Sequence, residues 1–429
     1  MAQEKELEKV QEKEQEEEQE EEQEEEQEKK LEDGEKAQGP RPRRKGSAFL
    51  IAWFLIVIIF LSAWNADRFV SMMGRELPGI TPANAKERTD RWDSYYTKYF
   101  RFMEPLAEVA GASFIVLGKR SVDNYSYIKD DEGVMQLVMD DFDRGRAERQ
   151  MQALAEAFDG RGIPLIFVSL PPRFEKEDFP VSKGLDLFGQ RDERMLSFLS
   201  GAGIGTLDAG QELKDAGARY LYPFKTDIHI ETAGEFETAR LLADRLESLG
   251  VTALDRDIVF DRENYRVAPH DFAGNLVQSS GIVYTKGRDS FELWFPEFDT
   301  DLTVKNPELG LVKNGPFADS VMNGLDDPKE LEKNPYPYWV LDYLQYPSPY
   351  YTVKNNLNEG GPSFLIIIDS YAMRMASYLS LCAGQVTVID PRGDGSEAYL
   401  ADAIESGEYD AVIVAAGGGD FYDSLNVTE

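Results

Sequence analysis

The sequence contains few of the residues on which metal and disulfide chemistry depends. Of its 429 residues, one is a cysteine (Cys382) and two are histidines (His229 and His270). A single cysteine excludes an intramolecular disulfide and an all-cysteine metal site, and two histidines leave little material for a zinc site. We therefore expect no metal and no cofactor, and a chemistry based on hydroxyl, carboxylate and imidazole groups.

Positive charge is also scarce. The chain carries 46 basic and 79 acidic residues, a formal net charge of -33. Residues 1–40 contain 18 acids and 6 bases, and residues 47–429 still contain 61 acids and 36 bases. Because contacts to phosphate need clustered Lys and Arg, this balance argues against a general nucleic-acid-binding protein.

Residues 1–45 have the composition of an acidic low-complexity tail. The segment consists mainly of Glu, Gln and Lys, with a near-repeat of EEEQ and almost no apolar residues. Because it has no apolar side chains to bury, we expect a solvated, disordered tail. A charged single helix is the alternative, since Glu and Gln favour helix, although like charges four residues apart oppose it.

A long apolar run follows the tail. Residues 46–66, GSAFLIAWFLIVIIFLSAWNA, contain no charged residue, and about 20 apolar residues cross a bilayer core. Four basic residues precede the run, namely Arg41, Arg43, Arg44 and Lys45. By the positive-inside rule we expect one transmembrane helix in the lipid bilayer, a cytoplasmic amino terminus and an extracytoplasmic domain after Asp67. A cleaved signal peptide is the alternative, but its apolar region is shorter, about 7–15 residues.

The rest of the chain alternates short apolar runs with amphipathic helices. We expect a stalk or first helix over residues 67–110 and an α/β domain with a largely parallel sheet over residues 111–429. Residues 111–128 predict a further strand or hairpin, and residues 251–345 break the alternation and predict a β-rich insertion. The expected strands are 164–170, 363–369, 385–390 and 410–416, and the expected helices are 144–159, 232–249, 371–382 and 396–406.

A serine follows one of the apolar runs at the point where a helix begins. Ser370 comes directly after Asp369 in the segment FLIIIDSYAMRM. Open α/β folds bind ligands at the carboxyl edge of the sheet, which is where this hydroxyl would lie. The helix amino terminus directs backbone N–H groups toward an oxyanion formed beside it. Ser370 is therefore a candidate nucleophile, with an ordinary Asp/Ser helix cap as the alternative.

One histidine has a carboxylate two residues before it. In the segment YPFKTDIHIETAG, Asp227 and His229 would point to the same side of an extended stretch. A carboxylate on one ring nitrogen fixes the tautomer and leaves the other nitrogen free to accept a serine proton. The alternative is a simple hydrogen-bonded pair in a loop. We interpret the second histidine, His270, as structural or surface-exposed, because it lies in the irregular insertion.

Four segments, in their order along the chain, resemble the alginate O-acetyltransferase proteins and their DHHW relatives, whose domains are SGNH-hydrolase-like. YPFKTDIHIETAG resembles the D-x-H-W signature, and IIIDSYAMRMASYL with VTVIDPR resembles the nucleophile segment and the strand end after it. GASFIVLGKRSVDNYSYI and GIPLIFVSLPPRFEKEDFP are similar to two earlier strands with their turns. The similarity covers roughly residues 100–429. It implies an SGNH-hydrolase-like (flavodoxin-like) three-layer α/β domain with the β-rich insertion.

The resemblance assigns roles to individual residues. It implies Ser370 as the nucleophile, His229 as the general base and Asp227 as the acid that orients the base. No segment matches the glycine and asparagine oxyanion blocks of ordinary SGNH hydrolases, so the available donors are the backbone N–H groups of Ser370 and Tyr371.

Three positions depart from the family pattern. The residues are Ile230 in place of the motif tryptophan, Ile228 in place of threonine or histidine, and Ile368 in place of the glycine before Asp-Ser. None of the three removes a member of the triad. Because the tryptophan is replaced, the family's substrate details do not carry over to this chain.

The resemblance implies a membrane-anchored, extracytoplasmic serine O-acyltransferase. It would transfer an acyl group, most simply acetyl, from an acyl donor to a cell-surface or exported polysaccharide through an acyl-serine intermediate. A multi-pass membrane O-acyltransferase is the partner that the family implies. The alternatives are a carbohydrate acetylesterase, a non-catalytic glycan-binding or export-complex scaffold, and a plain structural membrane protein.

Overall fold

The computed structural model describes residues 45–67, 70, 103–122, 127–129, 133, 135–137, 143–171, 187–217, 224–252, 255–277, 280–322, 348–416 and 419–427. The chain divides into two units, residues 1–101 and residues 102–429. The predicted acidic tail before residue 45, and the predicted stalk up to residue 102 apart from residues 67 and 70, lie outside the described residues.

The first unit contains one described helix, α2 (Lys45–Trp64), which covers most of the apolar run. Its side chains are described from residue 52 onward, and its large apolar ones are mostly exposed. Across the described residues of the chain, no helix has both the length and the apolar character that crossing a membrane requires. The transmembrane anchor stays a prediction.

The second unit is built on a mixed sheet of eight strands, in the order β5-β4-β13-β11-β12-β10-β8-β9. The five strands β5, β4, β13, β11 and β12 run parallel to one another. The pairs β12–β10, β10–β8 and β8–β9 are antiparallel. The strands are β4 (Leu165–Ser169), β5 (Gly205–Asp208), β8 (Leu302–Asn306), β9 (Leu311–Gly315), β10 (Tyr350–Asn355), β11 (Ser363–Ile368), β12 (Gln385–Ile389) and β13 (Ala411–Ala416). The predicted α/β domain is thereby confirmed, and its sheet, expected to be largely parallel, is mixed.

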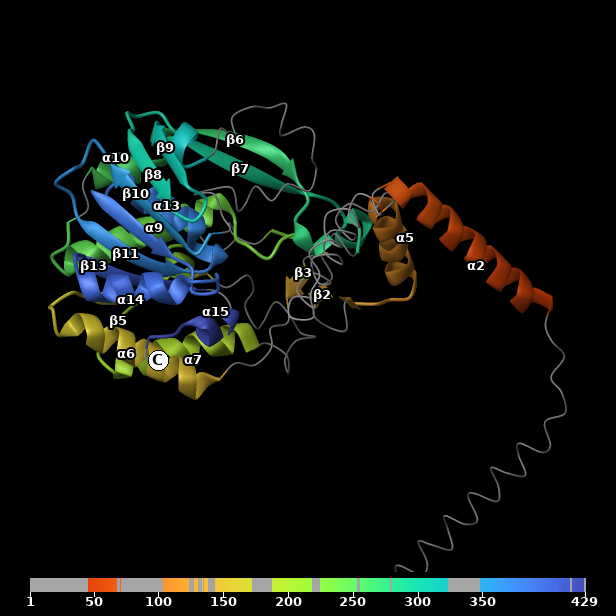
Figure 1. The fold of residues 1–429 in the computed structure, drawn as a ribbon, viewed down its shortest axis with the longest axis horizontal. Helices are drawn as coiled ribbons and strands as arrows, with labels where there is room; N and C mark the ends of the chain where they lie inside the picture. Colours follow the sequence, from red (N-terminus) through yellow and green to blue (C-terminus); the bar gives the residue numbers. More distant parts are fainter. Residues whose placement is uncertain are drawn as a thin grey trace, which may run out of the picture. The chain divides into compact units, whose positions relative to one another are not determined.

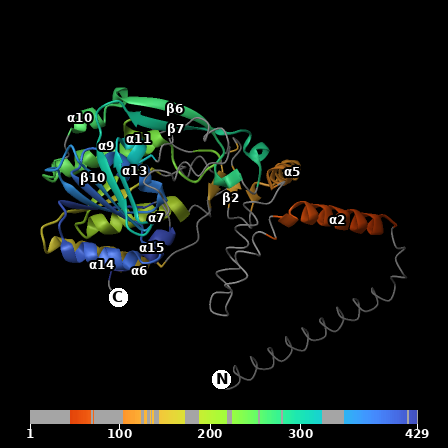
Figure 2. The same ribbon diagram turned by 45° about the horizontal axis from the view of Figure 1, so that its top comes forward.

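Helices cover both faces of this sheet, as Figures 1 and 2 show. One layer holds α6 (Arg144–Asp159), α7 (Leu187–Gly201), α14 (Ser396–Ser406) and α15 (Gly419–Ser424). The other holds α8 (Ala209–Asp215), α9 (Thr232–Ser248) and α13 (Met373–Leu379). The three layers explain why the central strands are continuous apolar runs, since both of their faces are buried.

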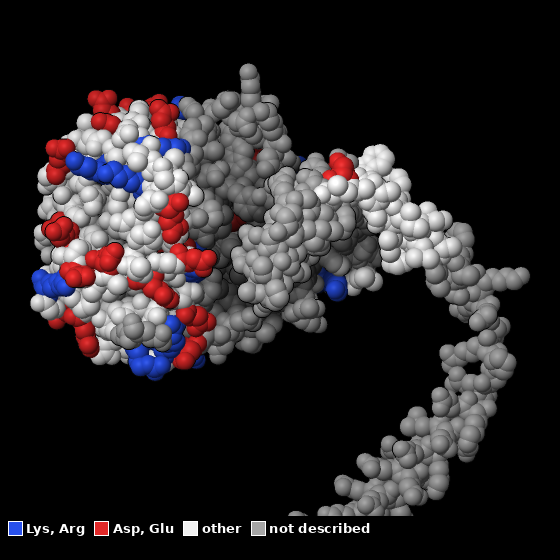
Figure 3. All heavy atoms as spheres, viewed as in Figure 1, with Lys and Arg blue, Asp and Glu red and all other residues white. Residues whose placement is uncertain are grey.

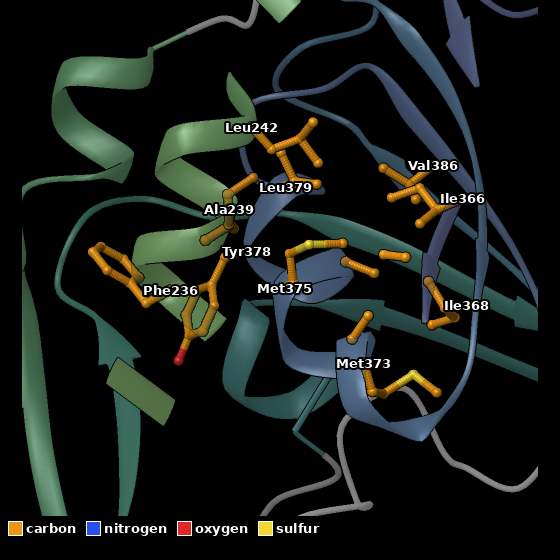
Figure 4. Close-up of a cluster of buried hydrophobic side chains, with 14 of the residues drawn as sticks. Phe236, Ala239, Leu242, Ile366, Ile368, Met373, Met375, Tyr378, Leu379 and Val386 are labelled. Atoms are coloured by element: carbon orange, nitrogen blue, oxygen red, sulfur yellow. The ribbon is translucent and has the colours of Figure 1, made fainter. Parts of the chain in front are cut away.

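Alternate side chains of strand β11 belong to the two faces of the sheet. Ile366 and Ile368 pack on the α9 and α13 side, whereas Leu365 and Ile367 pack on the α6 and α14 side. This split follows the two-residue period of a strand. Figure 4 shows the first of these clusters, in which side chains of α9 and α13 meet those of β11 and β12. The core therefore fixes α13 against both α9 and the strand before it.

The region predicted as a β-rich insertion contains two kinds of strand. The hairpin of β6 (Tyr265–Phe272) and β7 (Asp289–Pro296) forms a sheet of its own. Strands β8 and β9 instead join the main sheet through β10. The region also contains α10 (Arg256–Val259), η2 (Arg262–Asn264), η3 (Asn275–Val277), η4 (Ile282–Thr285) and α11 (Phe317–Ser320). Residues 323–347 lie outside the described part.

The expectation of a strand or hairpin over residues 111–128 is confirmed in part. Residues 111–116 belong to helix α5 (Met103–Val116), and the antiparallel strands β1 (Ser121–Val122) and β2 (Tyr127–Lys129) follow. A third strand, β3 (Met135–Leu137), completes a small antiparallel sheet. Gly111 packs so closely on Ser280 that a Cβ there would lie 1.9 Å from the Ser280 carbonyl oxygen. The glycine therefore allows helix α5 to pack closely on Ser280. The apolar run around it resembles a strand in the sequence, so the continuation of this helix past residue 110 was not predicted.

Candidate active site

Asp227 and His229 form a buried hydrogen-bonded pair. The Asp227 Oδ1 atom lies 2.6 Å from His229 Nδ1 and also accepts the backbone N–H of His229 at 2.9 Å. The segment is a turn rather than the extended stretch expected, because an Asp side chain readily accepts the N–H two residues on. The turn brings the carboxylate to the ring as the spacing predicted, and it fixes the ring through two bonds to one oxygen.

The turn that contains Asp227 and His229 is held by Asp289 of strand β7 and by a close contact with the backbone of Gly274. The Asp289 carboxylate accepts the backbone N–H groups of Lys225 and Thr226, at 2.9 Å and 2.8 Å. Gly274 donates its N–H to Thr226 Oγ1 at 2.9 Å. A Cβ on Gly274 would lie 2.3 Å from Asp227 Cβ and 2.5 Å from Asp227 Oδ2. Only glycine therefore fits against the carboxylate.

The second ring nitrogen of His229 is available. His229 Nε2 is buried, and within the described part of the chain it has no hydrogen-bond partner. The imidazole lies beside the ring of Tyr371, with 5.1 Å between centroids and a tilt of 40°. A buried imidazole nitrogen without a partner is costly in a folded protein unless a ligand or reaction uses it.

Ser370 lies at the turn that leads from β11 into α13. It is the first residue of the short 3-10 helix η7 (Ser370–Ala372), and 8 % of its surface is exposed. Its neighbour Tyr371 is the residue whose ring meets His229, so the serine and the histidine belong to the same corner of the domain. Since Nε2 has no partner among the described residues, the Ser370 hydroxyl and His229 are not hydrogen-bonded in this structure. Catalytic hydrogen bonds are often long before substrate binds.

The turn at Ser370 is shaped by Asp369. This fully buried carboxylate accepts the backbone N–H of Tyr371 at 2.9 Å. The predicted oxyanion donor at Tyr371 is thus occupied by Asp369. The expected helix over 371–382 accordingly begins with η7 and becomes α-helical at Met373.

A second acid stands at the carboxyl edge of the neighbouring strand. Asp390 follows β12 and receives three bonds from Arg392, one from its backbone N–H and two from its guanidinium group. The segment VTVIDPR, similar to the strand end of the family, therefore contains an ion pair between two residues of one loop.

A buried ion pair between α9 and α13 was not anticipated. Arg374 and Glu235 are both fully buried and face each other through the Arg374 Nε and Nη2 groups. Burial raises the pKa of Glu235, and Arg374 opposes that rise. The available signal was one charge of each sign inside the otherwise uncharged runs AMRMASYL and TAGEF.

Another acidic group near the site was also missed. Glu231, at the start of α9, has its pKa raised to about 7 by burial and by the nearby carboxylates of Glu292 and Asp289.

Among the described residues, no three His, Cys, Asp or Glu side chains are grouped as ligands of a metal ion.

Two further sequence-predicted positions, His270 and Ile230, take no part in the hydrogen bonds between Asp227 and His229. His270 is on β6, opposite Phe291 of β7, and partial burial lowers its pKa. Ile230, which stands where the family motif has tryptophan, is buried against Leu213 and Leu241. The isoleucine therefore fills core space and offers no surface for stacking on a sugar.

Solved structures share this fold at low sequence identity. PatB1 of Bacillus cereus matches with a TM-score of 0.53 and 14 % identity, over 70 % of this chain and 99 % of that one. The same protein with a sulfonyl adduct matches with a TM-score of 0.52 and 14 % identity, over 71 % and 100 %. A DHHW family protein from Eubacterium siraeum has a TM-score of 0.49 and 14 % identity, over 70 % and 91 %. No protein-family model and no curated protein matches the sequence. The two PatB1 matches show that this chain shares their fold, and a DHHW family protein is among the similar structures, as the resemblance in four sequence segments predicted.

Proposed function

We propose that this protein is a serine O-acyltransferase that acts on a polysaccharide, with Ser370, His229 and Asp227 as its triad. The observation that carries the proposal is the buried Asp227–His229 pair, whose free ring nitrogen stands in the corner occupied by the Ser370 turn. A carboxylate on Nδ1 and an unoccupied Nε2 are what a general base for a serine requires.

The reaction runs in two halves with His229 carrying the proton. Ser370 Oγ attacks the acyl carbonyl carbon of the donor while its proton passes to His229 Nε2, and the leaving group departs with that proton. The acyl-serine is then attacked by a sugar hydroxyl, whose proton passes to His229 and finally to Ser370 Oγ. Asp227 stabilises the imidazolium at both stages because its carboxylate lies 2.6 Å from Nδ1.

The oxyanion of each tetrahedral intermediate needs backbone donors at the start of the helix. The candidates are the N–H groups of Ser370 and Tyr371. Since the Tyr371 N–H donates to Asp369, the Ser370 N–H is the first donor, and the Tyr371 N–H serves after it exchanges the carboxylate for the oxyanion.

The charge of the domain favours a neutral or weakly charged acceptor. Residues 47–429 contain 61 acids and 36 bases, and Figure 3 shows acidic side chains spread among the basic ones on the described face. A strongly anionic polymer would meet repulsion from this surface. Turnover with a neutral oligosaccharide and with an oligouronate of equal length compares the two acceptors.

We place the domain outside the cytoplasm on a membrane anchor at residues 46–66, where it would meet a lipid bilayer and a multi-pass membrane O-acyltransferase. The exposed apolar side chains of α2, among them Trp53, Phe54, Ile56 and Ile59, support an apolar surrounding for this helix. Protease added to intact cells should remove the outer domain and spare the tail. Protection of the outer domain would overturn this topology.

The test of the nucleophile is covalent labelling of the full chain with an arylsulfonyl fluoride, followed by peptide mass spectrometry. We expect one adduct per chain, on the peptide that contains Ser370, and none in Ser370→Ala. Ser377→Ala is the matched control, on the helix that follows, since the Ser377 hydroxyl is buried and donates to the Met373 carbonyl. Equal labelling of Ser370→Ala and the wild type would refute the assignment.

A further inference from the structure

The buried pair Arg374–Glu235 joins the two segments that carry the proposed triad. Glu235 lies six residues after His229, at the beginning of α9, and Arg374 lies four residues after Ser370 on α13. No side-chain surface of either residue is exposed. Because the two helices also pack through Ala239, Met375 and Leu379, the pair is enclosed in the core.

The Glu235 carboxylate makes contacts that a simple ion pair would not need. Its Oε2 atom accepts the backbone N–H groups of Arg374 and Met375, at 2.8 Å and 3.0 Å. Its Oε1 atom accepts from Arg374 Nε at 2.8 Å. The carboxylate thereby fixes the first turn of α13, which is the turn that continues from Ser370.

The Arg374 guanidinium contacts the other segment in return. Its Nη2 group donates to the backbone carbonyl of Ile230, the residue directly after His229. The guanidinium carbon also lies 5.5 Å from the centroid of the Phe291 ring on β7. One side chain of α13 is therefore bonded to the His229 turn and packed on the strand that supports it.

An ion pair of this kind is an expensive way to hold two helices together. Replacing a buried ion pair by apolar residues of similar volume is often neutral or stabilising, because both charges lose their hydration. Apolar contacts between α9 and α13 already surround this pair. Its distinguishing property is directional, since the hydrogen bonds set the distance and rotation of one segment against the other.

We propose that Arg374 and Glu235 are positioning residues, which hold the Ser370 turn in register with His229 for acyl transfer. The proposal rests on the proposed function, since it takes Ser370 as the nucleophile. Neither residue contacts the reacting atoms. Their loss should lower the rate at which bound reagent reacts while leaving the binding of the reagent unchanged.

The test measures the maximal rate and the half-saturation concentration of arylsulfonyl fluoride labelling in the full chain. Misplacement by about 1 Å costs roughly 100-fold in rate, so Glu235→Gln and Arg374→Lys should lower the maximal rate about 10- to 100-fold. The half-saturation concentration should stay within about twofold, since the reagent's binding surface is untouched. Asp244→Asn is the control, because it removes an ion pair with Arg240 on the outer side of α9.

A double variant covers the case in which a single variant fails to fold. Glu235→Leu with Arg374→Met replaces the pair by apolar side chains of similar volume, which avoids the unpaired buried charge left when one partner alone is removed. The double variant still lacks the acceptor for the backbone N–H groups of Arg374 and Met375, so a lower thermal midpoint is expected, and circular dichroism checks that the protein is folded. We expect this folded variant to label slowly. A double variant that labels at the wild-type rate, or single variants whose maximal rate is unchanged, would overturn the positioning role. A wild-type protein that shows no adduct on Ser370 would instead refute the proposed function.

Discussion

The two histidines of this protein occupy contrasting regions. His229 lies in a buried turn at the edge of the main sheet, with a carboxylate on one nitrogen and nothing described on the other. His270 lies in the middle of β6, in a hairpin outside the main sheet and opposite an aromatic residue. The residue type is the same, so the difference in the chemistry open to the two histidines comes from the neighbouring residues.

The contrast has a physical cause in how each histidine is buried. At His229, burial is accompanied by an oriented acceptor, which favours one tautomer and stabilises the cation that catalysis would form. At His270, partial burial lowers the pKa, which favours the neutral ring. Burial of a histidine therefore indicates a base only when a fixed carboxylate accompanies it.

The largest effect is expected from breaking the carboxylate–imidazole contact. Asp227→Asn should lower the labelling rate of Ser370 by about 100- to 10,000-fold, because an amide cannot stabilise the imidazolium and favours the wrong tautomer. The rate is measured by quenching the labelling reaction at a series of times and quantifying the Ser370 adduct by mass spectrometry. Asp271→Asn, beside His270, is the matched control and should stay within about twofold. An equal loss of labelling rate in the two variants would mean that the general base has been assigned to the wrong histidine.

The next effect is expected from the glycine that fits against Asp227. Gly274→Ala would put a methyl group 2.3 Å from Asp227 Cβ, so the turn must move. We expect a loss of about 1–3 kcal/mol in the free energy of unfolding, since overpacking has this cost. The labelling rate should fall as well, because the displaced carboxylate releases His229.

A glycine with open space provides the control for that variant. Gly360→Ala meets no heavy atom within 4 Å, and it should change neither stability nor labelling. A Gly274→Ala protein with wild-type stability and rate would show that the turn is free to relax, and that Asp227 does not depend on this contact.

The outline of the site was predictable because it follows local rules. The strand β11 and the serine after it follow from a continuous apolar run, Asp369-Ser370 and a helix start. The Asp227–His229 pair follows from a spacing of two residues, although a turn rather than an extended strand produces it. Both features depend on residues that are neighbours in the chain.

The contacts that hold the site together were beyond the sequence. Glu235 meets Arg374 across 139 positions, and Asp289 meets Thr226 across 63. Such pairings depend on how helices and strands stack, which a single sequence does not encode in any local pattern. Strand β10, which joins β8 and β9 to the main sheet, was not predicted either.

A smaller effect should distinguish the acidic surroundings of His229 from those of His270. The pKa of Glu231 is raised to about 7, so between its unfolded value of 4.5 and 7 the folded state holds a proton that the unfolded state has lost. Stability should therefore fall as the pH rises through this window, by about 3 kcal/mol at most. Glu231→Gln should remove the loss and be the more stable protein above about pH 8.

Chemical denaturation at several pH values checks this expectation. Glu247→Gln, at an exposed position near the end of α9, controls for the removal of a carboxylate from the same helix. If Glu231→Gln and the wild type keep a constant difference in stability across the pH range, Glu231 does not ionise as burial and its acidic neighbours require.

The smallest effect is expected at His270 itself. Burial lowers its folded pKa, so at pH values near and below the unfolded pKa the unfolded state binds more protons than the folded state. Its contribution to stability should therefore worsen as the pH falls below the unfolded value of about 6.5, and His270→Gln should remove that loss. Because His270 is only partly buried, the gain of the variant at about pH 5 relative to pH 8 should stay below about 1 kcal/mol. Labelling of Ser370 should stay unchanged, since the hairpin holds no part of the triad. A His270→Gln protein that keeps the wild-type stability but loses labelling would mean that the hairpin reaches the reacting serine, and the contrast between the two histidines would no longer hold.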